Sequence, residues 1–247
     1  MKCSFISDLH IKESGDEASV ILDAFFASPE VKNSDRVYLL GDIFDFLVGE
    51  HRAYQKEYSN FFLGIKNLIS EGKEVIFIEG NHDFHFENTI RKYLKKNPLF
   101  SYLSAGVLEE WNGQKVFICH GYEIDYFNKY FKRWFKIYTS TWMKVLLSYI
   151  IPFFLLKRLA HSASKDSKRR GKKSFNYDLM KEKYLDGAKM LIREKKLSVI
   201  VGGHTHISEF HTYEDGTQYF NVGFPTRDKH FLFYDGDQFK KVPISLN

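Results

Sequence analysis

The chain has 247 residues, of which 44% are hydrophobic and 17% are aromatic, and its formal net charge is +5. This length allows one large domain or two small ones, and the composition argues against a disordered or repetitive protein. Only two cysteines occur, Cys3 and Cys119, which argues against a disulfide framework. We expect both to be buried as small apolar side chains.

The predicted elements alternate between short apolar strands and amphipathic helices. In chain order, the pattern predicts a strand at Lys2–Ser7, a helix at Glu17–Ala27, a strand at Arg36–Leu40, a helix at Arg52–Ser70, strands at Lys73–Glu79 and Lys115–Cys119, a helix at Tyr177–Lys196 and a strand at Ser198–Val201. Tight turns are predicted at Asp215-Gly216 and Asp235-Gly236, because glycine tolerates positive φ. The order is that of an α/β protein with an antiparallel β tail.

Clusters of metal-ligand residues follow five of these strands, at the point where each apolar run stops. They are Asp8-Leu9-His10, Gly41-Asp42, Gly80-Asn81-His82-Asp83, His120-Gly121 and Gly202-Gly203-His204-Thr205-His206. Sites in open α/β sheets form at the carboxyl ends of the strands, so five distant loops are expected to meet in one crevice. Carboxylate, amide and imidazole ligands without a thiolate suit two divalent ions, which together can activate water for attack on phosphorus.

The clusters resemble those of the calcineurin-like metallophosphoesterases, with Gly41-Asp42-Ile43-Phe44-Asp45 and Gly203-His204-Thr205-His206 among the matching motifs. The resemblance implies a four-layer α/β/β/α sandwich as a single domain over residues 1–247, with a helical lid inserted at 123–183. It implies these ligands: Asp8, His10 and His206 for one ion, Asn81, His120 and His204 for the other, and Asp42 bridging them. Mixed nitrogen and oxygen ligands favour Mn²⁺, with Fe²⁺ or Mg²⁺ as alternatives.

Two residues of the third cluster are the catalytic candidates. The resemblance places Asn81 and His82 at the reacting phosphate, where His82 would donate to a phosphoryl oxygen or protonate the leaving group. The alternative role for His82 is to orient the ligands. Asp45 and Asp83 are expected to orient ligands as well.

The segment from Glu123 to Lys183 differs in charge from the rest of the chain. It contains 15 Lys and Arg but 5 Asp and Glu, a local net charge of +10, whereas the remainder carries −5. Aromatic residues recur within it at helical spacing: Phe127, Tyr130, Phe131, Trp134 and Tyr138. An apolar run at Val145–Leu156 follows, broken by Pro152 and too short to cross a bilayer.

Three roles for this basic, aromatic segment remain open. It can be a structural helical hairpin with solvated lysines, a nucleic-acid surface, or an acyl-chain and membrane-surface site. A nucleic-acid partner is not expected, because the apolar run exceeds what base stacking requires. An apolar face flanked by bases instead suits the headgroup region of anionic lipid, so we expect the protein to be peripheral on a membrane surface.

The stretch from Ile151 to Ala160, followed by Asp166-Ser167-Lys168, resembles the lid of the UDP-2,3-diacylglucosamine diphosphatases. That resemblance implies hydrolysis of the pyrophosphate of a lipid A precursor, which releases UMP and a diacylglucosamine 1-phosphate. It implies these substrate contacts: Asp125, Ser167, Lys168, Phe153 and Phe154. The chain departs from the diphosphatases at His82, where they have arginine, and at Asn221-Val222-Gly223-Phe224, where they read Leu-Gly-Asp-Trp.

We therefore expect a metal-dependent hydrolase that cleaves UDP-2,3-diacylglucosamine. The alternatives are a general metallophosphoesterase for a nucleotide, phosphodiester or phosphoprotein, and a non-catalytic scaffold on the same fold. Scaffolds of this kind typically lose metal ligands, and the pattern here is complete. The N-terminus lacks the basic and apolar regions of a secretory signal, so we expect a cytoplasmic protein at the inner face of the cytoplasmic membrane. Oligomeric state is not predicted.

Overall fold

The computed structural model describes residues 1–125, 133, 136–137, 139–158 and 176–246. Its larger sheet has six strands in the order β13-β12-β1-β2-β4-β6. Their bounds are β1 Cys3–Ile6, β2 Arg36–Leu39, β4 Glu74–Ile78, β6 Phe100–Leu103, β12 His230–Tyr234 and β13 Phe239–Pro243. Strands β1, β2, β4 and β6 are parallel, whereas β12 and β13 pair antiparallel.

The second sheet has five strands in the order β10-β11-β9-β8-β7. Their bounds are β7 Val107–Trp111, β8 Gln114–Ile118, β9 Val199–Gly202, β10 Glu209–Thr212 and β11 Gln218–Asn221. A short parallel pair, β3 (Leu47–Val48) and β5 (Asp83–Phe84), joins two of the cluster-bearing loops. The predicted antiparallel tail is confirmed, with the turns of the two hairpins at Gly216 and Gly236, both at positive φ.

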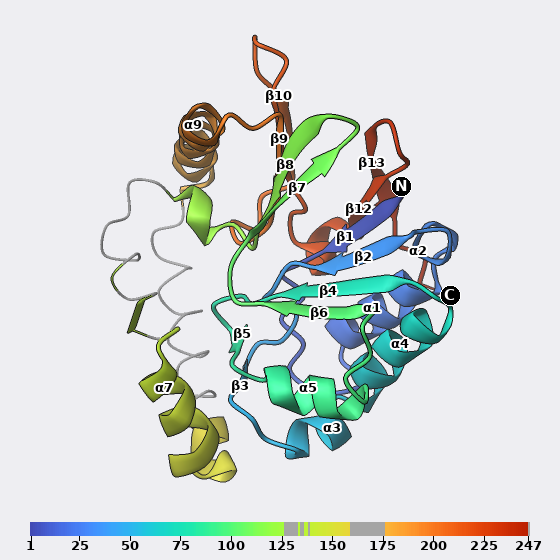
Figure 1. Ribbon diagram of the computed structural model, residues 1–247, viewed down its shortest axis with the longest axis vertical. Coiled ribbons are helices and arrows are strands. Elements are labelled where there is room, and N and C mark those ends of the chain that lie inside the picture. The colour runs from blue at the N-terminus through green and yellow to red at the C-terminus, as the bar shows by residue number, and fades with distance from the viewer. Residues whose placement is uncertain (126–132, 134–135, 138, 159–175, 247) are drawn as a thin grey trace.

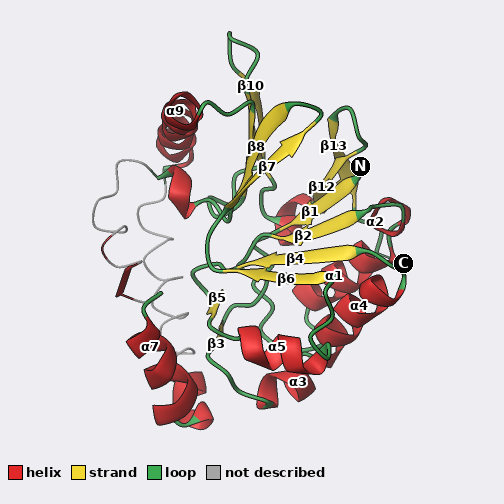
Figure 2. Cartoon of the chain, in the orientation of Figure 1, coloured by secondary structure: helices red, strands yellow, loops and turns green. Residues whose placement is uncertain are grey.

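Helices cover the outer faces of both sheets (Figures 1 and 2). Their bounds are α1 Glu17–Ala27, α2 Pro29–Lys32, α3 Ala53–Glu57, α4 Ser59–Ser70, α5 Glu87–Tyr93, η1 Tyr122–Ile124, α7 Thr141–Val145, the π-helical turn η2 Leu146–Ile150, α9 Tyr177–Lys195 and α10 Pro225–Asp228. Residues 153–158 are also helical. Residues 141–158 form a unit that is called the helical hairpin below. Among the helices of the described ranges, none is both long and apolar enough to cross a bilayer.

Three apolar cores confirm the predicted α/β/β/α layers. Alternate residues of β8 point to opposite faces: Ile118 lies in the core between the two sheets, and Phe117 packs toward α9. The third core lies between the large sheet and helices α1 and α4, where Phe25 and Phe62 are fully buried. Each such buried side chain contributes roughly 1.5–3 kcal/mol. Cys3 and Cys119 are buried and unpaired, as expected.

The helix predicted at Glu17–Ala27 is confirmed at both ends. It begins where the side chain of Asp16 accepts the N–H of Ser19 at 2.8 Å, and Pro29 follows its end. The single helix predicted at Arg52–Ser70 is wrong, because it is two helices that meet at Tyr58. The φ of Tyr58 is −116°, and its ring is buried 4.4 Å from that of Phe44. Tertiary packing of this ring therefore overrides the helical pattern.

The lid limits predicted at 123–183 stay a prediction, because much of that range lies outside the described residues. Within the described part, the apolar run is helical on both sides of Pro152, with Ile151 extended at φ −82° and ψ 121°. Proline disfavours helical backbone at the residue before it, which accounts for the break. The hairpin contacts the body at the loop after β3, where Nε2 of His51 lies 2.9 Å from the carbonyl oxygen of Leu147.

Candidate metal centre

The carboxyl ends of five strands bring the sequence clusters together. Asp8 follows β1, Asp42 follows β2, Asn81 follows β4, His120 follows β8 and His204 follows β9. The loops cross-link directly, since the N–H of Asp8 donates to the carbonyl of Gly41 at 3.1 Å and that of His204 donates to Oδ2 of Asp8 at 2.8 Å. The predicted convergence at one edge of the fold is thus observed.

The backbone is left-handed at five residues of the cluster-bearing loops. Positive φ values occur at Asp8, His10, Asp42, His204 and His206, between 51° and 72°. Residues with a Cβ rarely adopt this conformation, and each instance costs on the order of 1–3 kcal/mol, so the surrounding structure must hold it in place. Such strained backbone lowers stability and is concentrated at functional sites, so it identifies these loops as a candidate site.

One group of ligand atoms comprises Asp8, His10 and His206. Nε2 of His206 lies 3.3 Å from Oδ1 of Asp8 and 3.1 Å from Nε2 of His10. The three ligand atoms all lie within 4.8 Å of one another. This is the trio that the sequence assigned to one ion.

A second group comprises Asp42, His120 and His204, with Asn81 beside it. Nε2 of His120 lies 3.2 Å from Nδ1 of His204 and 3.2 Å from Oδ1 of Asn81. Oδ2 of Asp42 is 3.6 Å from Nε2 of His120 and 3.9 Å from Nε2 of His10. The carboxylate of Asp42 therefore stands between the two groups, where a bridging ligand is needed.

The charge states of these residues fit divalent metal ions. Burial is the main reason that the pKa of His10 and that of His204 fall to about 4, so both rings are neutral near pH 7. Burial alone would raise the pKa of Asp8 and Asp42, but nearby histidines hold both below 3.8. Imidazole nitrogens and carboxylate oxygens that converge on one space are the donor set of a transition-metal centre.

Neighbouring groups fix the orientation of the ligands. Nδ1 of His120 lies 2.6 Å from the carbonyl oxygen of Leu40, to which it donates, and this leaves Nε2 as the ligand atom. Asp83 accepts backbone N–H groups from the loop that carries Asp42 and from its own loop. The donors are Asp42 at 2.8 Å, Ile43 at 2.6 Å, Phe44 at 3.2 Å and Gly80 at 3.0 Å. Gly80 is required at this crossing, because a Cβ there would lie 2.3 Å from Oδ1 of Asp42.

The two catalytic candidates lie at the edge of both groups. Asn81 lies beside His120, as described above. Nδ1 of His82 lies 2.9 Å from the carbonyl oxygen of Asp45, to which it donates, and the backbone N–H of His82 donates to Oδ1 of Asp42 at 2.8 Å. The ring of His82 meets that of His10 edge-on, with 4.8 Å between centroids. Nε2 of His82 is thus the ring nitrogen available to a substrate.

A cavity of about 420 Å³ opens onto these residues. Its lining residues are Leu9, His10, Lys12, Asp16, Glu17, Ala18, Asp42, Asp45, Asn81, His82, His204, His206, Phe224 and Thr226. This volume lies within the range of about 300–1,000 Å³ that is typical of small-molecule sites. The cavity has room for a phosphoryl group at the histidines and for a further part of the substrate beside it.

The predicted substrate contacts lie in different places. Asp125 follows η1 and forms an ion pair with Lys183 at 2.7 Å. Phe153 packs edge-on against Tyr54, with 5.0 Å between centroids, whereas Phe154 is 72% exposed. The lining of the 420 Å³ cavity includes none of these three side chains. Ser167 and Lys168 lie outside the described residues, so all five substrate contacts stay predictions.

The structure adds residues that the sequence patterns do not single out as ligands or contacts. The ring of Phe224 stacks on that of His206, with 4.8 Å between centroids and 5° between planes. Nη2 of Arg227 donates to the carbonyl of His206 at 2.7 Å. Lys12 enters the cavity wall two residues after His10. Lys12 and Phe224 line one cavity although they are more than 200 residues apart, so local spacing carries no signal for this arrangement.

Known proteins resemble the chain over most of its length. Residues 1–208 match the calcineurin-like phosphoesterase profile. A UDP-2,3-diacylglucosamine hydrolase of Neisseria meningitidis serogroup C is 30% identical over 241 residues, which cover 97% of each chain. One of Vibrio parahaemolyticus is 26% identical and covers 87% of this chain and 85% of that protein. A solved archaeal phosphodiesterase structure is 15% identical, covers 98% and 99%, and has a TM-score of 0.49.

Proposed function

The chain belongs to the calcineurin-like phosphoesterase family and is a metal-dependent hydrolase, and on this premise we propose that it cleaves UDP-2,3-diacylglucosamine. Water adds to one phosphorus of the pyrophosphate, the bridging P–O bond breaks, and the products are UMP and 2,3-diacylglucosamine 1-phosphate. The observation that carries this proposal is the match to hydrolases of that name over 97% of both chains.

The two ligand groups would each hold one divalent ion. We assign Asp8, His10 and His206 to one ion, and His120, His204 and Asn81 to the other. Asp42 would contact both, because its carboxylate lies between the groups. The proposed metal is Mn²⁺, since imidazole-rich ligand sets with carboxylates suit it better than Mg²⁺. When bound, the ions supply Lewis acidity and activated water.

The chain's own residues orient the phosphate and move the proton. His82 is held by its Nδ1–H bond to the carbonyl of Asp45, so its Nε2 is the atom that exchanges a proton with the substrate. The doubly protonated ring would donate its Nε2 proton to the bridging oxygen, which leaves with the lipid phosphate, and the proton that the attacking water loses would restore the ring. The Asn81 amide, beside His120, positions the phosphoryl group. His82 stands where the diphosphatases have arginine, and this chain uses an imidazole for that contact.

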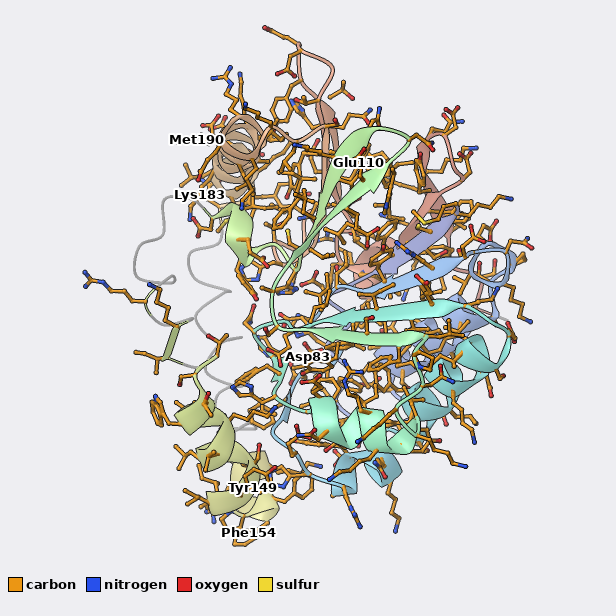
Figure 3. All side chains as sticks on the ribbon, viewed as in Figure 1. Asp83, Glu110, Tyr149, Phe154, Lys183 and Met190 are labelled. Carbon is orange, nitrogen blue, oxygen red and sulfur yellow. The ribbon has the colours of Figure 1, made fainter. Side chains whose placement is uncertain are left out.

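The helical hairpin supports a lipid substrate. It exposes large apolar side chains, with Tyr149 69% and Phe154 72% exposed, and Figure 3 shows both at the outer edge of the molecule. Lys144 and Lys157 lie on the same hairpin and form ion pairs with Glu50 and Glu57 of the body. An apolar surface next to cations suits anionic membrane, so we propose peripheral binding to the inner face of the cytoplasmic membrane.

The test is hydrolysis of the named substrate. Purified protein with Mn²⁺ is incubated with UDP-2,3-diacylglucosamine in detergent micelles, and UMP is quantified by anion-exchange chromatography. We expect UMP release that is lost in Asp42→Asn, because the bridging charge is removed. The matched control Asp237→Asn, at an exposed turn, should retain wild-type turnover. Turnover of a simple chromogenic phosphodiester without UMP release would refute the proposal and favour a general phosphoesterase.

A further inference from the structure

The cavity has two chemically different walls. His10, Asn81 and His82 line one wall, where the phosphoryl group is cleaved. The other wall comes from the loop after β1, the first turn of α1 and the segment after β11. Its residues are Leu9, Lys12, Asp16, Glu17, Ala18, Phe224 and Thr226. The proposed metal ligands do not explain this second wall, which continues the cavity beyond them.

Among the charged side chains of this second wall, the ammonium group of Lys12 has no ion-pair partner in the described part of the chain. Both carboxylates are already used, because Asp16 accepts the backbone N–H groups of Lys12 and Ser19 at 2.8 Å each and Glu17 pairs with Lys229. The ammonium group of Lys12 forms no ion pair with the residues that the structure describes. Its backbone is nevertheless fixed, since the carbonyl of Lys12 accepts the hydroxyl of Tyr58 at 3.3 Å. Lys12 is thus an anchored, exposed cation at the cavity.

The same wall has a flat apolar surface near that cation. The ring of Phe224 is held parallel to His206, and Leu9 and Ala18 are almost fully buried beside the cavity. Thr226 is held in place by a 3.3 Å hydrogen bond from its hydroxyl to the carbonyl of Leu9. A ribose and a planar base need contacts of this kind, an aromatic and aliphatic surface edged by polar groups.

Acyl chains are a poor match for this wall. They gain from contact with apolar surface, whereas Lys12, Asp16 and Glu17 would have to be desolvated against them. The described part of the chain offers apolar surface elsewhere, on the helical hairpin, which does not line this cavity. The two halves of a bound lipid-linked nucleotide are therefore expected to extend from the cleavage site in different directions.

We propose that this wall is the nucleotide subsite and that Lys12 is a substrate-binding residue that contacts the nucleoside monophosphate half of the substrate. The inference rests on the proposed function and deepens it. The ammonium group of Lys12 donates to the nucleotide's oxygen atoms, and the ring of Phe224 supports the ribose and base. The subsite selects a nucleotide whatever lipid is attached to the other phosphate.

The test measures UMP binding by calorimetry with the Mn²⁺-loaded protein. Lys12→Met should weaken UMP binding about tenfold, as expected for one charge-assisted hydrogen bond. Lys12→Arg should restore most of the affinity, and the control Lys66→Met, at an exposed position on α4, should match wild type. The difference between Lys12→Met and wild type should shrink between about 50 mM and about 500 mM NaCl, because salt screens an exposed charge.

A parallel hydrolysis assay separates this subsite from the proposed function. If the lipid substrate yields no UMP but UMP binds in a Lys12-dependent manner, the subsite is supported and another nucleotide is the substrate. If UMP is released but Lys12→Met binds UMP like wild type, the subsite is refuted and the proposed function stands. Failure of the wild-type protein to bind UMP also refutes it.

Discussion

Asp83 provides the most demanding test of how the metal centre is held. Its Oδ1 accepts the N–H groups of Asp42 and Gly80, and its Oδ2 accepts those of Ile43 and Phe44. Asp83→Asn replaces one oxygen with an NH₂ group that faces two donors, so two hydrogen bonds are lost. At about 1–2 kcal/mol each, the loss is about 3 kcal/mol.

Charge relief offsets part of that loss. Burial, and then the neighbouring carboxylate of Asp42, raise the pKa of Asp83 well above 3.8, so the neutral amide removes an unfavourable charge interaction. The hydrogen-bond loss of about 3 kcal/mol is therefore an upper limit, and with an m-value of about 2–3 kcal/mol/M the urea midpoint should fall by at most about 1–1.5 M. Tyrosine and tryptophan fluorescence during urea titration measures this shift.

The same variant should lose metal, because the loop that carries Asp42 is no longer fixed. Elemental analysis of purified Asp83→Asn is expected to find less bound metal than in wild type. Asp237→Asn, an exposed aspartate in the β12–β13 turn, is the control and should change neither quantity. A wild-type urea midpoint together with full metal content would show that the Asp83 contacts do not hold the site.

Two further substitutions test the buried carboxyl group of Glu123 and the exposed ring of Phe154. Burial raises the pKa of Glu123 above 4.5, although the N–H groups of Gly106 and Gly121 donate to it at 3.0 Å. The folded state thus binds this proton more tightly than the unfolded chain, so the contribution of Glu123 to stability falls as pH rises above about 4.5. The urea midpoint of Glu123→Gln relative to that of wild type should therefore increase as pH rises above this value. A difference that is constant with pH would contradict this. Phe154→Asp should reduce co-sedimentation with phosphatidylglycerol vesicles about tenfold or more, since a buried phenylalanine contributes roughly 1.5–3 kcal/mol. Leu63→Asp, at a half-exposed position on α4, is the control, and an equal loss in both variants would refute a specific membrane face.

Local sequence predicted the structure correctly where residues within one helix or turn determine it. The helix at Glu17–Ala27 has its own N-cap in Asp16, and the glycine of the Asp-Gly pair in each β-tail turn has the positive φ that the turn requires. It failed at Tyr58, where packing against Phe44 divides a helix that the pattern shows as continuous. Propensity is weak compared with the burial of an aromatic ring, so such breaks are not readable from spacing.

The sequence by itself determined which clusters meet, because every cluster follows a parallel strand and the carboxyl ends of parallel strands lie at one edge of each sheet. It did not determine how they are arranged there. The family resemblance implied that Asp42 bridges the two groups, but only the tertiary structure brought Lys12 and Phe224 to one cavity and separated the packed Phe153 from the exposed Phe154. The physical reason is that side-chain direction at a strand end depends on left-handed backbone and on contacts with loops far away in the chain, which local patterns do not encode.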